Sequence, residues 1–224
     1  MQDLANRVAE VRSRIADAVR RGGHGQAVRL VAVTKTYGSE AVEAAHACGV
    51  DDVGENRVQE ALDKQALVSV PVRWHLIGHL QRNKVKALDH FHLVHSVDSA
   101  RLADAVHEHG ARRGRPVDAL VQVNVVGEMS KGGYAVADLA REAERLRGLS
   151  GLRVLGVMTM APLEADERTL RTVFGGARDA LRHLRAAGHD CHELSMGMSG
   201  DYELAVEEGA TMVRLGTVLF GERH

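Results

Sequence analysis

The feature that most constrains the fold of this chain is the alternation of short β-branched runs with longer helical patterns. The runs lie at residues 28–33, 51–53, 72–77, 91–95, 117–123, 152–157, 192–195 and 212–215. Between them, helical patterns cover residues 39–48, 55–67, 81–88, 99–113, 135–147, 166–187 and 200–208, and a short final turn begins at Thr217. A strand followed by a helix, repeated eight times, predicts an α/β fold with one parallel sheet closed into a TIM-type (β/α)₈ barrel.

An extra helix precedes the first strand. An apolar stripe at spacings of three and four is formed by Leu4, Val8, Val11, Ile15 and Val19. The same alternation permits an open doubly wound sheet, but eight strands in an open sheet would be unusual for 224 residues. We find no linker or change of composition, and we therefore expect residues 1–224 to form a single domain.

Charge and cysteine content exclude several classes of function. The 29 Lys and Arg residues nearly balance 30 Asp and Glu residues, so no electrostatic feature favours nucleic acid or an anionic membrane as a partner. Cys48 and Cys191 form no disulfide or metal motif, and the histidines, including His107 and His109, show no metal-ligand spacing. No apolar run approaches the roughly 20 residues that span a bilayer. We expect a cytoplasmic protein without a metal.

Lys35 follows the first apolar run, residues 29–33, within two residues. A lysine at a strand end is most often a surface residue. In barrels, however, catalytic groups lie at the carboxyl ends of the strands, where a partly desolvated lysine can present a neutral amine to an aldehyde. This location makes Lys35 a candidate nucleophile.

Two hydroxyl residues, Ser199 and Thr217, follow the seventh and eighth runs at the starts of helical patterns. Either one alone is more simply explained as a helix cap. Together they favour a bound phosphate, because the loops after strands 7 and 8 are where barrels usually hold one. Arg214, at the end of the eighth run, is a ligand contact or a strand-end ion pair.

Seven ordered motifs between about residue 28 and residue 223 together resemble one family, the YggS/PROSC pyridoxal phosphate homeostasis proteins. The motifs are AVTKTYG (32–38), GENRVQE (54–60), WHLIGHLQRNK (74–84), QVNVVGEMSKGGY (122–134), GLRVLGVMTMAP (151–162), SMGMSGDYELA (195–205) and VRLGTVLFGER (213–223). The fold of this family resembles the barrel domain of alanine racemase and of bacterial-type ornithine decarboxylases, without their second β domain. The resemblance therefore also implies a barrel.

The resemblance implies pyridoxal 5′-phosphate (PLP) as cofactor, held as an imine on Lys35. Ser199 and the backbone at Gly216 and Thr217 would hold the phosphate. Arg214 would face the pyridine nitrogen and keep it unprotonated, because a guanidinium only donates hydrogen bonds.

Further residues of the motifs are implied near the cofactor. Asn56 would lie beside the ring, with His75 and Met158 near the pocket floor or wall; Asn56 is equally explained as a helix cap, and His75 as a core histidine. Gly38, where the family often has proline, departs from the pattern and loosens the turn after Lys35. Lys131 is a possible second lysine near the cofactor, although a solvated loop lysine is the simpler interpretation.

Two functions are compatible with Lys35: a monomeric carrier that takes up PLP and delivers it to apo-enzymes, or an amino-acid racemase or related fold-type III enzyme. Racemisation by two bases needs an acid/base group on each face of the substrate. In alanine racemase the second is a tyrosine of the additional domain of a partner subunit, and Tyr37, Tyr134 and Tyr202 cannot be assigned that role. We therefore favour the carrier over an enzyme. A barrel enzyme acting on another sugar or nucleotide phosphate remains a third hypothesis.

Overall fold

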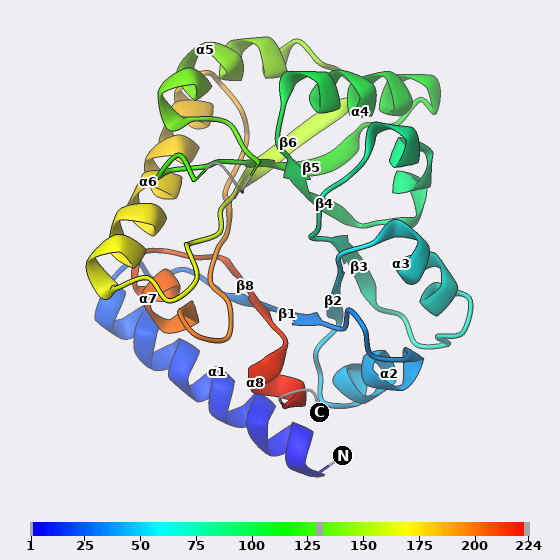
Figure 1. The fold of residues 1–224 in the computed structure, drawn as a ribbon, viewed down its shortest axis with the longest axis vertical. Helices are drawn as coiled ribbons and strands as arrows, with labels where there is room; N and C mark the ends of the chain where they lie inside the picture. The colour runs from blue at the N-terminus through cyan, green and yellow to red at the C-terminus, as the bar shows by residue number, and fades with distance from the viewer. Residues whose placement is uncertain (1, 129–131, 222–224) are drawn as a thin grey trace.

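Figure 1 shows a closed barrel of eight parallel strands surrounded by helices, in a computed structural model that describes residues 2–128 and 132–221. The strands are β1 (Arg29–Val33), β2 (Asp52–Glu55), β3 (Arg73–Leu76), β4 (Leu93–Val97), β5 (Val117–Gln122), β6 (Leu152–Met158), β7 (Glu193–Ser195) and β8 (Met212–Leu215). Each strand pairs with the next, and β8 closes on β1 with Arg214 opposite Val31. The predicted (β/α)₈ barrel is confirmed, and the open sheet is excluded because it would leave β1 and β8 unpaired.

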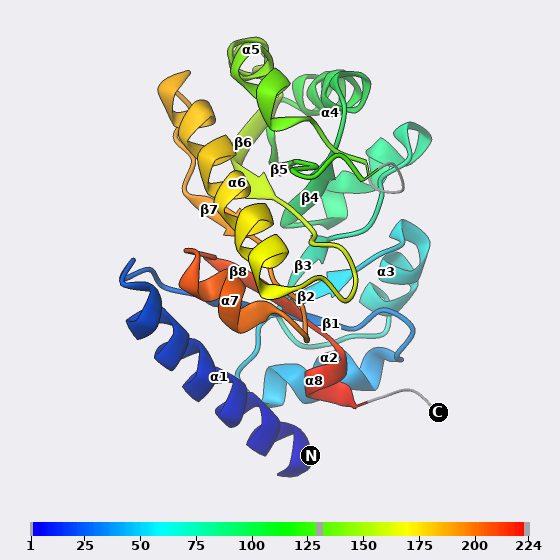
Figure 2. The same cartoon turned by 60° about the vertical axis from the view of Figure 1, so that its left-hand side comes forward.

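Helices cover the outside of the strands in both views (Figure 1, Figure 2). They are α2 (Ser39–Ala47), α3 (Val58–Gln65), η1 (Arg82–His90), α4 (Ala100–Arg112), α5 (Val136–Arg147), α6 (Glu167–Ala186), α7 (Tyr202–Glu207) and α8 (Thr217–Phe220). The segment after β3 is a 3₁₀ helix: its buried residues, Val85 and Leu88, are three apart, the spacing that three residues per turn places on one side. Helix α3 begins later than expected, because Glu55 still belongs to β2.

The extra helix, α1 (Gln2–Gly22), lies along the flank of the barrel formed by the short helices α7 and α8 (Figure 2). Val8, Val11 and Ile15 of the predicted stripe are buried, and Leu4 and Val19 pack against the same core. Arg7 donates to the carbonyl of Leu219 at 3.1 Å. Helix α1 thus covers a side where α7 and α8 are too short to bury the barrel alone.

A row of hydrogen-bonded polar side chains crosses the barrel interior towards the carboxyl ends of the strands. Asp52 Oδ1 lies 2.8 Å from His75 Nε2, and His75 Nδ1 lies 2.9 Å from His95 Nε2. His95 Nδ1 lies 2.9 Å from Ser195 Oγ, which accepts from Arg214 Nη1 at 2.6 Å. All five residues are buried. The row therefore connects β2, β3, β4, β7 and β8 through side chains.

The two ends of this row fix the direction of each hydrogen bond. The guanidinium end can only donate. At the other end burial opposes the charge of Asp52, but hydrogen bonds from Arg73 and His75 hold its pKa below the usual range, so this carboxylate only accepts. His75 Nε2 therefore donates to Asp52, and His75 Nδ1 accepts from His95. Nδ1 of His95 accepts in turn from the Ser195 hydroxyl. Both histidines are neutral and carry their proton on Nε2.

This assignment predicts a pH dependence. Burial lowers the pKa of His75 and of His95 from the ordinary value of 6.5. The unfolded chain therefore protonates these histidines first, and the stability that they contribute is complete above about pH 6.5 and is lost as the pH falls. We expect the free energy of unfolding, measured with urea, to decrease below that pH. NMR of the imidazole nitrogens at about pH 6.5 should show both rings as neutral Nε2–H tautomers; an Nδ1–H tautomer at either ring would contradict the assigned direction.

Candidate functional site

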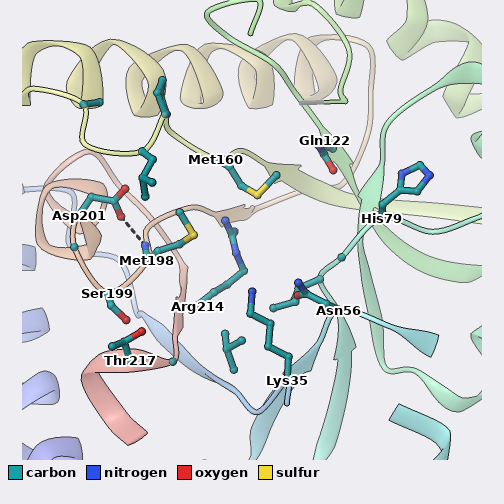
Figure 3. Close-up of a pocket in the computed structure, with 18 of the residues that line it drawn as sticks. Lys35, Asn56, His79, Gln122, Met160, Met198, Ser199, Asp201, Arg214 and Thr217 are labelled. Atoms are coloured by element: carbon teal, nitrogen blue, oxygen red, sulfur yellow. Dashed lines mark hydrogen bonds between the residues drawn. The ribbon is translucent and has the colours of Figure 1, made fainter. Parts of the chain in front are cut away.

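A cavity of about 810 Å³ opens where the strands of the barrel end. Its lining includes Lys35 after β1, Asn56 after β2, Asp98 after β4, Ser199 after β7 and Arg214 in β8. Figure 3 shows Lys35 and Arg214 directed into the same space, with the hydroxyls of Ser199 and Thr217 close together beside them. The topology of the barrel thus brings together groups that are far apart in the sequence.

Six of the eight predicted site residues line this cavity: Lys35, Asn56, Ser199, Arg214, Gly216 and Thr217. The other two, His75 and Met158, are buried in the barrel and are not among the lining residues. Met158 packs with Leu93, Leu120 and Met212 in a small apolar cluster that contacts Met160 of the cavity wall. His75 belongs to the polar row that ends at Arg214.

Lys35 lies on a tight turn directly after β1. The turn is closed by a hydrogen bond of 3.0 Å from the Tyr37 N–H to the Thr34 carbonyl. Thr36, the third residue of the turn, has a φ of 65°, a left-handed conformation that a β-branched residue rarely adopts. The half-buried Lys35 is therefore presented by backbone that is strained on its own and depends on its surroundings.

The guanidinium of Arg214 is a buried cation whose hydrogen-bond partners are all neutral oxygens. It donates to the carbonyl and the hydroxyl of Ser195, at 2.8 and 2.6 Å, and to the carbonyl of Thr159 at 2.9 Å. Burial lowers the pKa of Arg214 to about 10, partly offset by the charge of Asp201, so the side chain is still positive at neutral pH. Within the described part of the chain no carboxylate forms an ion pair with it. Such a cation favours an anionic or electron-rich ligand in the adjoining cavity.

The loops after β7 and β8 meet at Ser199. Its hydroxyl accepts a hydrogen bond of 3.2 Å from the backbone N–H of Val218, so Ser199 caps the neighbouring helix α8 rather than the helix that follows it in sequence. Thr217 is exposed at the start of α8. A Cβ added at Gly200 would meet no atom within 4 Å, so its backbone is open to a ligand. This set of hydroxyls and backbone groups can donate to a small anion.

Sequence reasoning missed several lining residues. Exposed His79 is held at 3.1 Å by Asp98, and Gln122 donates to the Gly132 carbonyl at 2.7 Å. His79 stands in the same motif as His75, but it follows β3, whereas His75 lies within that strand. Preferring residues beyond a strand end over residues inside it would have selected His79.

None of the three tyrosines lines the cavity. The Tyr37 hydroxyl donates to the Gly221 carbonyl at 3.3 Å, and the Tyr134 hydroxyl donates to Glu142 at 3.2 Å. Tyr202 is buried with the main hydrophobic core. No tyrosine is therefore placed to act on a ligand opposite Lys35.

The remaining expectations concern Lys131, metal ligands, membrane spans and the two cysteines. Lys131 lies outside the described residues. Across residues 2–128 and 132–221, no group of three His, Cys, Asp or Glu residues is arranged to hold a metal ion, and no helix is long and apolar enough to cross a membrane. Cys48 and Cys191 are free cysteines.

Known proteins resemble this chain over its whole length. The pyridoxal phosphate homeostasis protein of Pseudomonas aeruginosa is 43% identical over 226 residues, which cover 100% of this chain and 97% of that protein. The protein of the same name from Aquifex aeolicus is 41% identical and covers 99% of both chains. Among solved structures, PipY of Synechococcus elongatus PCC7942 with PLP bound has a TM-score of 0.86 and 37% identity, over 97% of this chain and 100% of that one.

More distant structures share the fold alone. Alanine racemase from Corynebacterium glutamicum has a TM-score of 0.71 at 18% identity, and the match covers 95% of this chain but 63% of the enzyme. The family described as "Alanine racemase, N-terminal domain" matches residues 7–224. The chain therefore belongs to the alanine racemase N-terminal domain family and, within it, to the group of the pyridoxal phosphate homeostasis proteins.

Proposed function

We propose that this protein binds PLP in the cavity between Lys35 and Arg214 and acts in the homeostasis of that cofactor. The observation that carries the proposal is that one cavity combines a lysine on a strained turn with a buried arginine whose hydrogen-bond partners, among the described residues, are neutral oxygens. PLP offers a chemical partner for each group: an aldehyde for the amine, and a phosphate and a basic ring nitrogen for cations and other donors. PipY, a relative with this fold, has been solved with PLP bound.

In this proposal Lys35 is the covalent attachment point. When bound, the cofactor supplies an electrophilic aldehyde carbon, and a primary amine at a barrel mouth is the side chain suited to combine with it. Lys35 is half-buried, so water or an incoming amine can still reach the linkage. A reversible attachment is what a carrier needs.

The phosphate is assigned to Ser199, Thr217 and the backbone at Gly216. Two hydroxyls and backbone N–H groups at the start of α8 provide short-range donors without a fixed counter-charge. The open backbone of Gly200 leaves room for phosphate oxygens to approach closely.

Arg214 is assigned to the ring nitrogen and Asn56 to the side of the ring. A guanidinium cannot accept a proton, so it keeps the nitrogen unprotonated and makes the ring a weak electron sink. His75 and Met158 contribute from beneath in this scheme: His75 through the polar row that holds Arg214, and Met158 through its packing against Met160.

We infer that the protein carries PLP rather than turning over amino acids. The Pseudomonas and Aquifex homeostasis proteins match over nearly their whole length, whereas the corynebacterial racemase matches over only part of its chain. None of the tyrosines lines the cavity that Lys35 lines. Apo-enzymes of the cytoplasm are the proposed recipients, and the carrier is proposed to act as a monomer. A racemase-like enzyme is the alternative, and it would require exposed His79, held by Asp98, to act as a second acid/base group.

The first prediction concerns the attachment point. Borohydride treatment of the PLP-loaded protein should fix a pyridoxyl group on Lys35, and Lys35→Ala should lose the absorbance band of the linkage. Lys86→Ala, which removes an exposed lysine of η1, should keep both. Mass analysis of the peptide around residue 35 checks this, and a label found wholly on another lysine would refute the assignment.

The second prediction concerns the phosphate. The double variant Ser199→Ala and Thr217→Ala should weaken binding of PLP by about tenfold or more, because hydrogen bonds to a charged group are lost, while binding of pyridoxal changes little. Thr172→Ala, which removes an exposed hydroxyl of α6, serves as the control. Titrations with both ligands would argue against the site if the two affinities fell equally.

The third prediction separates carrier from enzyme. Loaded protein should exchange the α-proton of alanine or serine for solvent deuterium only slowly, because an unprotonated ring is a weak electron sink and a missing acid/base group typically forfeits on the order of 10²–10⁴ in rate. It should still transfer PLP to an apo-enzyme in solution. Turnover of any amino acid at roughly 1 s⁻¹ or faster would restore the enzyme hypothesis.

A further inference from the structure

The backbone on both sides of Lys35 is bound by two side chains of one helix. Lys64 of α3 donates to the carbonyl of Thr34 at 2.7 Å, immediately before Lys35. Glu60 of α3 accepts a short hydrogen bond from the N–H of Thr36, immediately after Lys35. Both ends of the strained turn are therefore held from the same element.

Glu60 and Lys64 also hold each other. They stand four residues apart on α3, the spacing that places two side chains on one face of a helix, and their charged groups lie 2.9 Å apart. One carboxylate oxygen of Glu60 thus accepts both from Lys64 and from the left-handed residue Thr36. A shift of either side chain would release a contact with the turn.

A second acidic residue, Glu55, completes the group. Lys64 donates to Glu55 at 2.7 Å, and Glu55 accepts from the hydroxyl of Thr34 at 2.6 Å. The ammonium therefore has three acceptors for its three N–H bonds. Lys64 is 6% exposed and Glu55 is fully buried, and a buried ion pair is seldom a net gain in stability over apolar residues of similar size. The presence of this group at the turn points to a need for one defined conformation.

The group does not reach the ligand space. Glu55, Glu60 and Lys64 are not among the residues that line the cavity. Any effect that they have on a ligand must pass through the turn that carries Lys35, or through Asn56, which follows Glu55 at the end of β2.

We infer that Glu60 and Lys64 are positioning residues for Lys35: by binding the Thr34 carbonyl and the Thr36 amide, they hold the turn in the conformation that directs the lysine amine towards the aldehyde carbon of the ligand. This inference rests on the proposed function of Lys35. It assigns to α3 a role in covalent capture of PLP that is distinct from recognition of its ring and phosphate.

The test compares two ligands that differ only in the aldehyde. PLP can combine with Lys35, whereas 4′-deoxypyridoxine 5′-phosphate has the same ring and phosphate but no aldehyde. Glu60→Ala should weaken PLP binding by about tenfold, the effect of one charge-assisted hydrogen bond, and change binding of the deoxy analogue by less than about twofold. Glu60→Gln retains an acceptor oxygen for the Thr36 amide. It should restore most of the difference in affinity between PLP and the deoxy analogue.

The matched control is Asp63→Ala. It removes a carboxylate from the same helix. Asp63 is exposed and accepts a hydrogen bond from Gln59, a residue of the same helix. Both affinities should remain at wild-type values, and thermal unfolding should show each variant folded.

The positioning role would be overturned if Glu60→Ala weakened binding of both ligands equally or left the preference for PLP unchanged. A loss of this preference in Asp63→Ala would overturn it too. Should Glu60→Ala fail to fold, the double variant Glu55→Gln and Lys64→Met must show the same selective loss for PLP; it removes the buried Glu55–Lys64 pair and leaves only the partly exposed carboxylate of Glu60 without its lysine partner. A wild-type protein that bound neither ligand would overturn the proposed function itself, and this result is distinct from all the others.

Discussion

The positive charge of Arg214 inside the barrel is the constraint on which the rest of the site depends. Burying an ion costs several kcal/mol unless opposite charge or hydrogen bonds replace the lost water. Here the replacements are neutral: the Ser195 and Thr159 oxygens. The Ser195 hydroxyl can accept from the guanidinium because it donates onward to His95, and the row ends on a true anion only at Asp52. Compensation of the charge is thus spread across the barrel, and the cavity side of the guanidinium is left to interact with a ligand.

The two buried cations near the cavity, Lys64 behind Lys35 and Arg214 in its lining, have opposite kinds of partners. Beside Lys35, the ammonium of Lys64 is neutralised at close range by Glu55 and Glu60, so this cation is structural and its contacts serve the backbone. At Arg214 the hydrogen-bond partners among the described residues are neutral oxygens, so its charge is left to act on a molecule in the cavity. In the proposed site, Lys64 would position the nucleophile, and Arg214 would recognise the ligand. Substitutions at these two cations should therefore have separable effects on a bound molecule.

Local patterns predicted the barrel well because strand and helix periodicity are properties of neighbouring residues. Lys35, Ser199 and Arg214 were found for a related reason: each stands at a strand end, and a closed barrel brings all strand ends to one mouth. The polar row could not be found in this way, because the contact between His95 and Ser195 joins residues 100 positions apart. In the sequence, Lys64 has the pattern of an ordinary surface lysine of an amphipathic helix; the packing of α3 against β2 and the contacts of Lys64 with Thr34 and Glu55 bury it. His75 was selected by motif, and the structure gives it neighbours inside the barrel.

The cavity has buried contacts beneath it and exposed residues at its edge, an arrangement that fits the proposed carrier. Racemisation by two bases needs acid/base groups fixed on both faces of a bound molecule, which requires atoms that enclose it. Here the well-defined contacts lie beneath the cavity, in the row behind Arg214 and the ion pairs behind Lys35, while Thr217 and His79 at its edge are exposed. In the proposed carrier, the contacts beneath the cavity would determine which molecule is bound and where its aldehyde lies. The exposed side would leave the proposed linkage open to water and to other amines, so the same geometry would serve both capture and release.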